Sequence, residues 1–257
     1  MKSSLLALLA VVIPFADAGA NGDEWRAPFI TTPADVVERM LQIAETRADD
    51  LVIDLGSGDG RIVIAAAQQF GARALGIELD AALVEKSRKN AELAQVSSRA
   101  SFVQGDVLTA DISRATVVTV YLLPALMEKL QSRFISQLAP GTRIVSHAFT
   151  MAGWAPDRSE TVRIAQRHPG QGNESRVHLW IVPADVRGVW RNAEMQVQIE
   201  QNYQRIEVHG ASQASISGRN ISWEIGGARF SGRVEGNRLA GEMFVMGVSR
   251  PFVLLRN

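Results

Sequence analysis

The chain contains no cysteine, so disulfides, cysteine metal ligands and thiol nucleophiles are all excluded. It also lacks an excess of either charge, because 27 Lys and Arg balance 27 Asp and Glu. No overall field therefore attracts nucleic acid or an anionic membrane, although a local basic patch is compatible with this balance. With 46% hydrophobic and 21% charged residues, the composition is that of a globular protein. A length of 257 residues allows one large domain, or a medium one with a small one.

The first residues have the pattern of a targeting segment. Lys2 precedes the apolar run Leu5 to Ala16, and Ala16-Asp17-Ala18 supplies the small residues of a cleavage site. We therefore expect a signal peptide at residues 1–18 and an exported, periplasmic protein. The apolar run is short for a transmembrane helix. If it is not cleaved, the alternative is an N-terminal anchor that associates the protein with a membrane.

A glycine-rich loop follows the first strongly apolar run of the interior. Leu51 to Leu55 leads into Gly56, Gly58 and Gly60, with Ser57 between the first two, and a helical pattern comes next. Glycine suits such a turn from strand to helix because a Cβ would hinder both the turn and the close approach of a ligand. The helix that follows presents unpaired backbone N–H groups. This arrangement is typical of a nucleotide-cofactor loop.

The spacing of this loop distinguishes two classes of cofactor. A dinucleotide site would need its last glycine at the position of Arg61. An acid, Asp54, stands instead two residues before the first glycine. A carboxylate there would repel a pyrophosphate, but it suits a cofactor that carries an ammonium group, such as S-adenosylmethionine.

Two further acids end the next two apolar runs. Glu78, followed by Leu79, lies at the tip of the expected second strand, where a carboxylate accepts hydrogen bonds from ribose hydroxyls. Asp106, followed by Val107, ends the next run, where a carboxylate can face the adenine amino group. A glycine loop alone is often a plain turn. The loop and both acids in this order predict a cofactor site. We expect this site to include Glu78 and Leu79 from the second run, and Asp106 and Val107 from the third.

These motifs resemble those of the class I, seven-β-strand, S-adenosylmethionine-dependent methyltransferases. Asp54 to Gly60 matches their first motif, Glu78 their ribose acid, and Gly105-Asp106 their adenine-side motif. Three flanking segments are similar to bacterial relatives of the mitochondrial lysine methyltransferases of the ADP/ATP carrier and the ATP synthase c-subunit: Pro28 to Pro33, Tyr121 to Pro124 and Ala139 to Ser146. The resemblance implies methyl transfer from S-adenosylmethionine, with a lysine side chain of a protein as acceptor.

The fold class follows from an alternation of apolar runs and amphipathic helices after Leu51, which predicts a parallel sheet covered on both faces. Together with the resemblance, this gives a Rossmann-like, seven-stranded, mostly parallel sheet in a methyltransferase domain at residues 26–183. Thr32 is expected to cap a helix that begins at Pro33, and Asp80 to cap the helix from Ala81. The later strands are expected at Thr116 to Leu123, Thr142 to Ser146, Thr161 to Gln166 and Arg176 to Val182.

The pattern changes after Pro183. Apolar residues alternate with polar ones at period two, and glycines interrupt the pattern at regular intervals. This predicts about six short antiparallel strands in up-and-down order. We therefore expect a small all-β module at residues 187–257, which does not touch the cofactor.

Several polar and aromatic residues are candidates for the chemistry. Tyr121 lies near the end of the fourth run and either bonds a substrate amine or belongs to the core. His147 follows the fifth run and is either a general base or a capping group, and Trp154 is a candidate pocket wall. The remaining histidines are interpreted as structural, and their spacing predicts no metal site; they are His168, His178 and His209.

Tyr121-Leu122-Leu123-Pro124 replaces the Asn/Asp-Pro-Pro-aromatic motif of methyltransferases that act on bases or glutamine. A nucleic-acid substrate is therefore disfavoured. The favoured function is protein-lysine N-methylation. The alternatives are a small-molecule methyltransferase and an exported, non-catalytic binding protein on a methyltransferase scaffold. Export would create a problem of supply, because S-adenosylmethionine is made in the cytosol.

Overall fold

The computed structural model describes residues 30–165 and 172–256. The expected signal peptide, Pro28, Phe29 and His168 lie outside these residues. The first part of the chain forms a seven-stranded sheet in the order β3-β2-β1-β4-β5-β7-β6. Its strands are β1 (Leu51–Leu55), β2 (Arg73–Glu78), β3 (Ala100–Gln104), β4 (Val117–Val120), β5 (Arg143–His147), β6 (Arg158–Arg163) and β7 (Glu174–Ile181).

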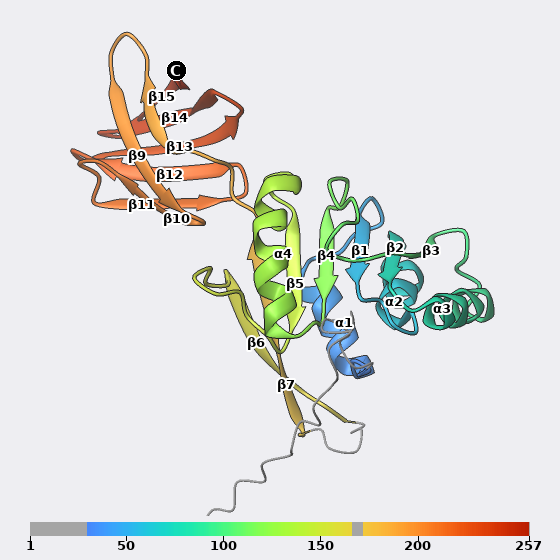
Figure 1. Cartoon of the computed structure of the whole chain (residues 1–257). Helices are drawn as coiled ribbons and strands as arrows, with labels where there is room; N and C mark the ends of the chain where they lie inside the picture. The colour runs from blue at the N-terminus through green and yellow to red at the C-terminus, as the bar shows by residue number, and fades with distance from the viewer. Residues whose placement is uncertain (1–29, 166–171, 257) are drawn as a thin grey trace, which may run out of the picture.

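The sheet is parallel from β3 to β5, whereas β7 runs antiparallel to β5 and β6 antiparallel to β7. Figure 1 shows the sheet with helices on both sides. The helices are α1 (Ala34–Ile43), α2 (Arg61–Phe70), α3 (Ala81–Leu93) and α4 (Pro124–Gln137). The predicted Rossmann-like, mostly parallel sheet is confirmed.

Alternate residues of the buried strands supply two separate hydrophobic cores. Val52 and Val117 point to the core that α1, α2 and α3 share. Their neighbours Ile53 and Val118 point to the opposite core, which α4 covers. Since both faces of these strands are buried, their sequences are continuous apolar runs rather than alternating ones.

The direction of the parallel strands shows at which edge of the sheet a ligand is expected to bind. The loops after β1, β2, β3 and β4 all leave from the same edge, since these strands are parallel. The order also reverses between β1 and β4, because the chain moves outward to β3 on one side and to β5 on the other. Ligands of doubly wound sheets bind beyond such a switch point.

Several predicted element ends need correction. The fourth strand ends at Val120, since its partner β1 ends at Leu55, directly opposite, and leaves no ladder for Tyr121 to Leu123. His147 is the last residue of β5 and is buried, rather than lying beyond the strand. The first helix begins at Ala34, with Pro33 as its N-cap residue. Thr32 does not cap this helix, because its hydroxyl contacts His147 instead. The predicted cap at Asp80 is confirmed: its carboxylate accepts from the N–H groups of the first turn of α3.

The C-terminal part forms a separate eight-stranded antiparallel sheet in the order β10-β9-β8-β15-β14-β13-β12-β11. The strands are β8 (Gly188–Arg191), β9 (Gln196–Asn202), β10 (Arg205–Val208), β11 (Gln213–Ser217), β12 (Asn220–Ile225), β13 (Ala228–Glu235), β14 (Arg238–Val245) and β15 (Val248–Arg256). Consecutive strands pair except β10 and β11, which form the two edges of the sheet, and β8 also pairs with β15. The all-β module is confirmed. The expected number of strands was too low, because short polar strands such as β11 carry little period-two signal.

Aromatic side chains fill the interior of this C-terminal module. Trp223 on β12 and Phe230 on β13 are cross-strand partners, and their rings stack at 4.8 Å between centroids. Phe252 meets both rings edge-on. Such pairs add to the free energy of plain apolar burial. The module therefore has a core of its own, separate from the two cores of the first sheet.

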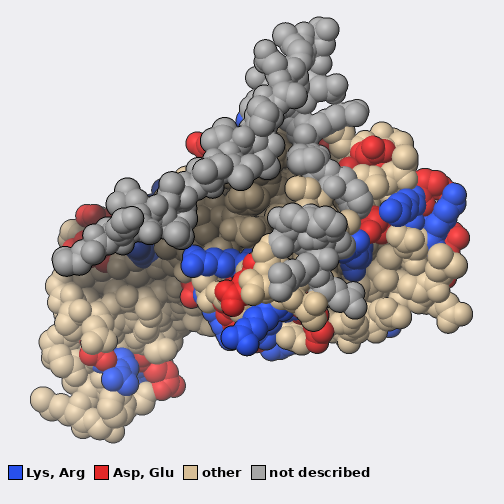
Figure 2. All heavy atoms as spheres, turned by 90° about the horizontal axis from the view of Figure 1, so that it is seen from below, with Lys and Arg blue, Asp and Glu red and all other residues tan. Residues whose placement is uncertain are grey.

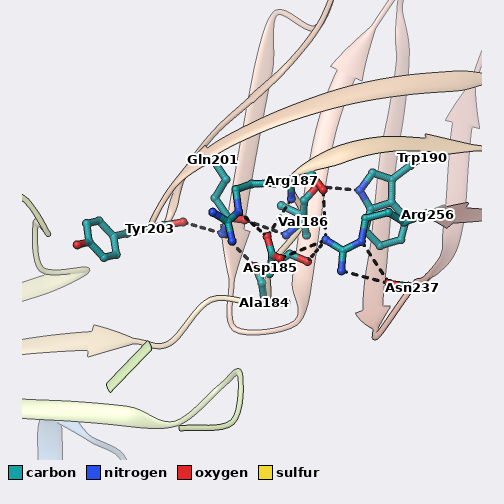
Figure 3. Close-up of polar contacts among 9 residues, drawn as sticks. All are labelled: Ala184, Asp185, Val186, Arg187, Trp190, Gln201, Tyr203, Asn237 and Arg256. Atoms are coloured by element: carbon teal, nitrogen blue, oxygen red, sulfur yellow. Dashed lines mark hydrogen bonds and ion pairs between the residues drawn. The ribbon is translucent and has the colours of Figure 1, made fainter. Parts of the chain in front are cut away.

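The linker between the two parts is bound to the module, as Figure 3 shows. The Gln201 side chain accepts from the N–H of Val186 at 2.8 Å and donates to the carbonyl of Ala184 at 2.9 Å. Arg256 donates to the carbonyl of Asp185 at 2.9 Å, and its guanidinium lies 5.1 Å from the centre of the Trp190 ring. Strands β9 and β15 of the module thus both fix the same short stretch of chain.

Tyr203, in the turn between β9 and β10, contacts the methyltransferase part; Figure 3 shows it pointing away from the module. Its ring stacks on Trp154 at 4.9 Å, and its hydroxyl accepts from Nε2 of Gln131 on α4 at 2.7 Å. Gly218 approaches Gly141, just before β5 begins. The module therefore contacts the amino-terminal end of β5, at the opposite end of the sheet from the switch-point loops.

Candidate cofactor and acceptor site

A cavity of about 390 Å³ lies beyond the carboxyl ends of the parallel strands. All the predicted cofactor residues except Gly60 line it: Asp54, Gly56, Ser57, Gly58, Glu78, Leu79, Asp106 and Val107. Tyr121 also lines it, whereas His147 and Trp154 do not. None of the lining residues belongs to the C-terminal module. The structure thus brings together residues that come from four different strand ends.

The three glycines of the loop all adopt left-handed backbone conformations, with φ of +77° at Gly56, +56° at Gly58 and +84° at Gly60. These values are unfavourable for any other residue. Gly60 has an additional constraint, because a Cβ there would lie 2.7 Å from both Ser87 and Phe102. Gly60 therefore serves the close packing of α2 against α3 and β3, while Gly56 and Gly58 border the cavity.

Asp54 is buried in the floor of the cavity. The hydroxyl of Thr119, its register partner on β4, donates to Oδ1 at 2.7 Å. Burial raises the pKa of Asp54 to about 7, and the negative charges of Glu78 and Asp59 act in the same direction. A buried carboxylate without a cation is costly, so a positively charged ligand group would stabilise its ionised form.

Glu78 connects two of the loops around the cavity. Its Oε2 accepts from the N–H of Gly58 at 2.9 Å, and its Oε1 accepts from the N–H of Asp80 at 3.0 Å. The carboxylate is therefore held at the tip of β2, between the glycine loop and the start of α3. Each oxygen has further acceptor capacity, which suits a pair of ribose hydroxyls.

The remaining predicted residues form an apolar wall with a polar rim. Leu79 is 48% exposed although it lines the cavity, so a flat apolar group could cover it. Val107 lies on the same cavity, and Oδ1 of Asp106 accepts from the N–H of Leu108 at 2.8 Å. This bond fixes the turn after β3 and leaves a second carboxylate oxygen for an amino group.

Tyr121 lines the edge of this cavity, and His147 packs against it from behind, outside the lining. Their ring centroids are 4.0 Å apart, and burial raises the pKa of Tyr121, so that its hydroxyl stays protonated. His147 is only 2% exposed, and burial lowers its pKa to about 4. Its Nδ1 contacts Oγ1 of Thr32 at 3.2 Å, and its Nε2 contacts Oγ of Ser175 at 2.6 Å. The neutral imidazole thus faces two hydroxyls instead of open space.

Trp154, His178 and His209 make structural contacts outside the cavity. Trp154 is 1% exposed and packs between Tyr203 and Trp180, at the contact with the module. His178 pairs with Ser159, and His209 with Glu200. Within residues 30–165 and 172–256, no three His, Asp or Glu side chains lie close enough to hold a metal ion.

Sequence reasoning missed several residues of the site. Asp59 and Arg61 line the cavity without having been assigned to it, whereas Thr31 and Thr32 line it as part of the segment Pro28 to Pro33, which the family resemblance had singled out. Arg61 stands where a dinucleotide-binding motif would have its last glycine. The sequence therefore indicated only that this glycine is absent, and it gave no function for the arginine side chain. Gly76, inside β2, was also missed: a Cβ there would lie 2.5 Å from Phe102 and from the hydroxyl of Ser57. A glycine within a strand signals such a close approach.

The residues present fit S-adenosylmethionine. Asp54 offers a buried negative charge, Glu78 offers acceptors at the position of a ribose, and Leu79 with Asp106 offers an apolar wall beside a carboxylate. Buried Ser57 Oγ has no hydrogen-bond partner among the described residues, so a polar atom is left for a ligand. Together with the strand order, these features define an S-adenosylmethionine-binding methyltransferase.

Comparison with known proteins places the chain within this class. The sequence model of the ANTKMT methyltransferase domain matches residues 54–158. A protein-lysine N-methyltransferase from Saccharolobus islandicus is 42% identical over 156 residues, which are 60% of this chain and 93% of that protein. The lysine N-methyltransferase of the ATP synthase c-subunit from Xenopus laevis is 32% identical, over 60% of this chain and 66% of that protein. The chain belongs to the same family as these two relatives, and it is an S-adenosylmethionine-dependent methyltransferase.

A solved structure supports the same assignment. It is described as an RNA methyltransferase from Salinibacter ruber in complex with S-adenosylhomocysteine. Its sequence is 48% identical, and the match covers 61% of this chain and 96% of that one, with a TM-score of 0.55. The match therefore spans nearly all of that chain and leaves about two fifths of this chain unmatched.

The raised pKa of Asp54 predicts pH-dependent cofactor binding. A cationic ligand favours ionised Asp54, so binding lowers its pKa from about 7. Affinity is therefore expected to rise with pH up to about 7 and then level off, changing by up to about ten-fold per pH unit below that point. Calorimetry with S-adenosylhomocysteine between pH 5.5 and 8 measures how this affinity changes with pH. Asp54→Asn, which keeps an acceptor for Thr119, is the control for titration of the ligand itself. A wild-type profile identical to that of Asp54→Asn would contradict the assignment.

Proposed function

We propose that this enzyme methylates the side-chain amine of lysine residues in proteins. The observation that carries the proposal is the 42% identity to the Saccharolobus islandicus protein-lysine N-methyltransferase across 93% of that protein. The family match at residues 54–158 includes the glycine loop, both acids and Tyr121.

The chemistry of the cavity supports an amine acceptor. When bound, the cofactor supplies a methyl group that is already activated, so the protein mainly orients the amine and excludes water. Such orientation can contribute about 7–11 kcal/mol to lowering the barrier. A lysine must arrive neutral, and apolar Leu122 and Leu126 beside Tyr121 favour the neutral amine through desolvation.

We propose that Tyr121 contacts this amine. Its hydroxyl has no hydrogen-bond partner among the described residues, and Tyr121 lines the same cavity as Asp54 and Glu78. The pKa of His147, lowered to about 4 by burial, makes it a weak base at neutral pH. We therefore assign His147 a supporting position behind Tyr121, in place of the general base that was one of its two expected roles.

Labelled-methyl transfer onto membrane and soluble protein extracts tests the acceptor. We expect label in protein, recovered as methyl-lysine after hydrolysis and amino-acid analysis, with Glu78→Ala as the inactive control. Label found only in small molecules would support the alternative of a small-molecule methyltransferase. Label in RNA would support the activity described for the Salinibacter ruber relative. Figure 2 shows charges of both signs mixed on the face seen from below, which does not favour a polyanion.

We also propose that residues 1–18 direct the protein to a membrane, either as a cleaved signal peptide or as an anchor. The support is the sequence pattern of Lys2, the apolar run and the Ala-x-Ala site. Within the described part of the chain, no helix is long and apolar enough to span a bilayer. N-terminal sequencing after cell fractionation separates the outcomes: a chain that begins at Gly19 indicates export, an intact membrane-bound chain indicates an anchor, and an intact soluble chain rejects both.

A further inference from the structure

The segment Ile30 to Thr32, which we term the entry segment, borders the cavity directly before α1. Thr32 is 4% exposed, and it is held by two hydrogen bonds from different parts of the molecule. One reaches its carbonyl oxygen and the other its side-chain hydroxyl. The two bonds can therefore be removed separately by substitution.

The first bond comes from Arg61, the first residue of α2. Its Nη1 donates to the carbonyl of Thr32 at 2.7 Å. The guanidinium is fixed by Asp59, with 2.9 Å from Nε to Oδ1 and 2.6 Å from Nη2 to Oδ2. A cation beside a cationic cofactor would otherwise be unfavourable. Its pairing with Asp59 neutralises it and leaves Asp54 and Glu78 for the ligand.

The second bond comes from His147, which lies 115 residues away in sequence and contacts the Thr32 hydroxyl. The other ring nitrogen contacts Ser175 on β7, so the imidazole is fixed at both ends. Its face lies 4.0 Å from the Tyr121 ring, measured between centroids. A continuous path therefore runs from the glycine loop through Arg61, Thr32 and His147 to Tyr121.

We propose that Arg61 and His147 are positioning residues that hold the entry segment across the cavity. Arg61 holds the segment against the cofactor loop, and His147 sets the orientation of Tyr121 toward the methyl acceptor. Cofactor retention and acceptor alignment are then coupled through Thr32. The role of Arg61 concerns cofactor binding alone. The role of His147 in orienting Tyr121 toward an amine rests on the proposed function.

The test uses the full-length protein and S-adenosylhomocysteine as probe, so it needs no acceptor. Arg61→Gln is expected to weaken binding about ten-fold or more, because a charged donor is lost. Thr32→Val keeps the carbonyl but loses the hydroxyl, and should weaken binding about two- to ten-fold. If both bonds act through one segment, the double variant should lose less than the product of the two effects.

Tyr121 provides a second readout, since the chain has only 2 tyrosines. In NMR spectra of protein with ¹³C-labelled tyrosine, Thr32→Val is expected to shift the Tyr121 ring signal and leave that of Tyr203 in place. Tyr203→Phe assigns the two signals. Ser159→Ala is the matched control, because it removes a similar hydroxyl–imidazole contact, to His178 at 2.8 Å, away from the cavity.

The outcomes separate the proposal from a general loss of structure. Arg61→Lys keeps a charge and a donor and should recover part of the affinity, so it replaces Arg61→Gln if the latter does not fold. Unchanged binding in folded Arg61→Gln, an unmoved Tyr121 signal in Thr32→Val, or independent effects in the double variant would overturn it. Equal losses in Ser159→Ala would overturn it too. A protein that passes these tests but transfers no methyl group to lysine disproves the proposed function alone.

Discussion

Glu78→Ala is expected to lower the affinity for S-adenosylhomocysteine by at least about 100-fold, the largest binding effect of any single side chain here. Two charge-assisted hydrogen bonds to a ribose would be lost, each contributing about 1.5–3 kcal/mol. The N–H groups of Gly58 and Asp80 would lose their acceptor as well, so both loops beside the cavity would become less ordered. Isothermal calorimetry measures the change directly.

Two variants serve as controls for this result. Glu78→Gln keeps one acceptor oxygen and should fall between the wild type and Glu78→Ala. Glu85→Gln changes an exposed acid on α3 that pairs with Lys89, outside the cavity, and should bind as the wild type does. A folded Glu78→Ala protein with wild-type affinity would show that the ribose is not held at the end of β2.

Trp154→Ala is expected to destabilise the protein by about 3–5 kcal/mol, the largest stability effect of the substitutions considered. Its indole is 1% exposed and packs on both Trp180 and the Tyr203 ring. The variant therefore creates a cavity in the methyltransferase core and also removes the contact with the module. Chemical denaturation monitored by fluorescence measures the loss. Tyr203→Phe keeps the stack and loses only the bond from Gln131, so it should cost about 1 kcal/mol.

A chain truncated after Ala184 separates stability from cofactor binding. It should still bind S-adenosylhomocysteine, since all residues that line the cavity lie between Ile30 and Leu126. Its melting temperature should fall, because Trp154 loses the ring stacked on it. If this chain folds but no longer binds the cofactor, the predicted boundary at residues 183–187 is wrong. The module would then be required for the site in spite of its place at the other end of the sheet.

Local signals were sufficient for the cofactor half of the cavity. A strand, a turn that requires positive φ and a helix follow one another within a few residues, so Gly56, Gly58 and Asp54 could be assigned without any knowledge of distant contacts. Glu78 and Asp106 lie far from this loop in sequence. They could be assigned because parallel strands bring their carboxyl ends to one edge, so topology alone places these acids together.

Local signals were not sufficient for the part of the cavity around Tyr121, where the methyl acceptor is proposed to bind. Tyr121 and His147 were found because they lie close to the ends of expected strands, but their roles depend on which atoms surround them. The sequence gives no sign that Thr32 lies on His147, or that Ser175 lies on its other nitrogen. Without these contacts, a histidine at a strand end is an obvious candidate base. With them, it is a buried, neutral imidazole that packs against Tyr121.

The sequence by itself determined the fold class, the cofactor and the division into a methyltransferase part and a β-rich part. These follow from periodicity, from the spacing of glycines and acids along the chain, and from the resemblance to a known family. Only the tertiary structure decided that Arg61 and His147 hold Thr32, and that Trp154 meets Tyr203 instead of a ligand. The physical reason is that periodicity encodes whether a side chain is buried but not against what. That choice is made when elements distant in sequence pack together.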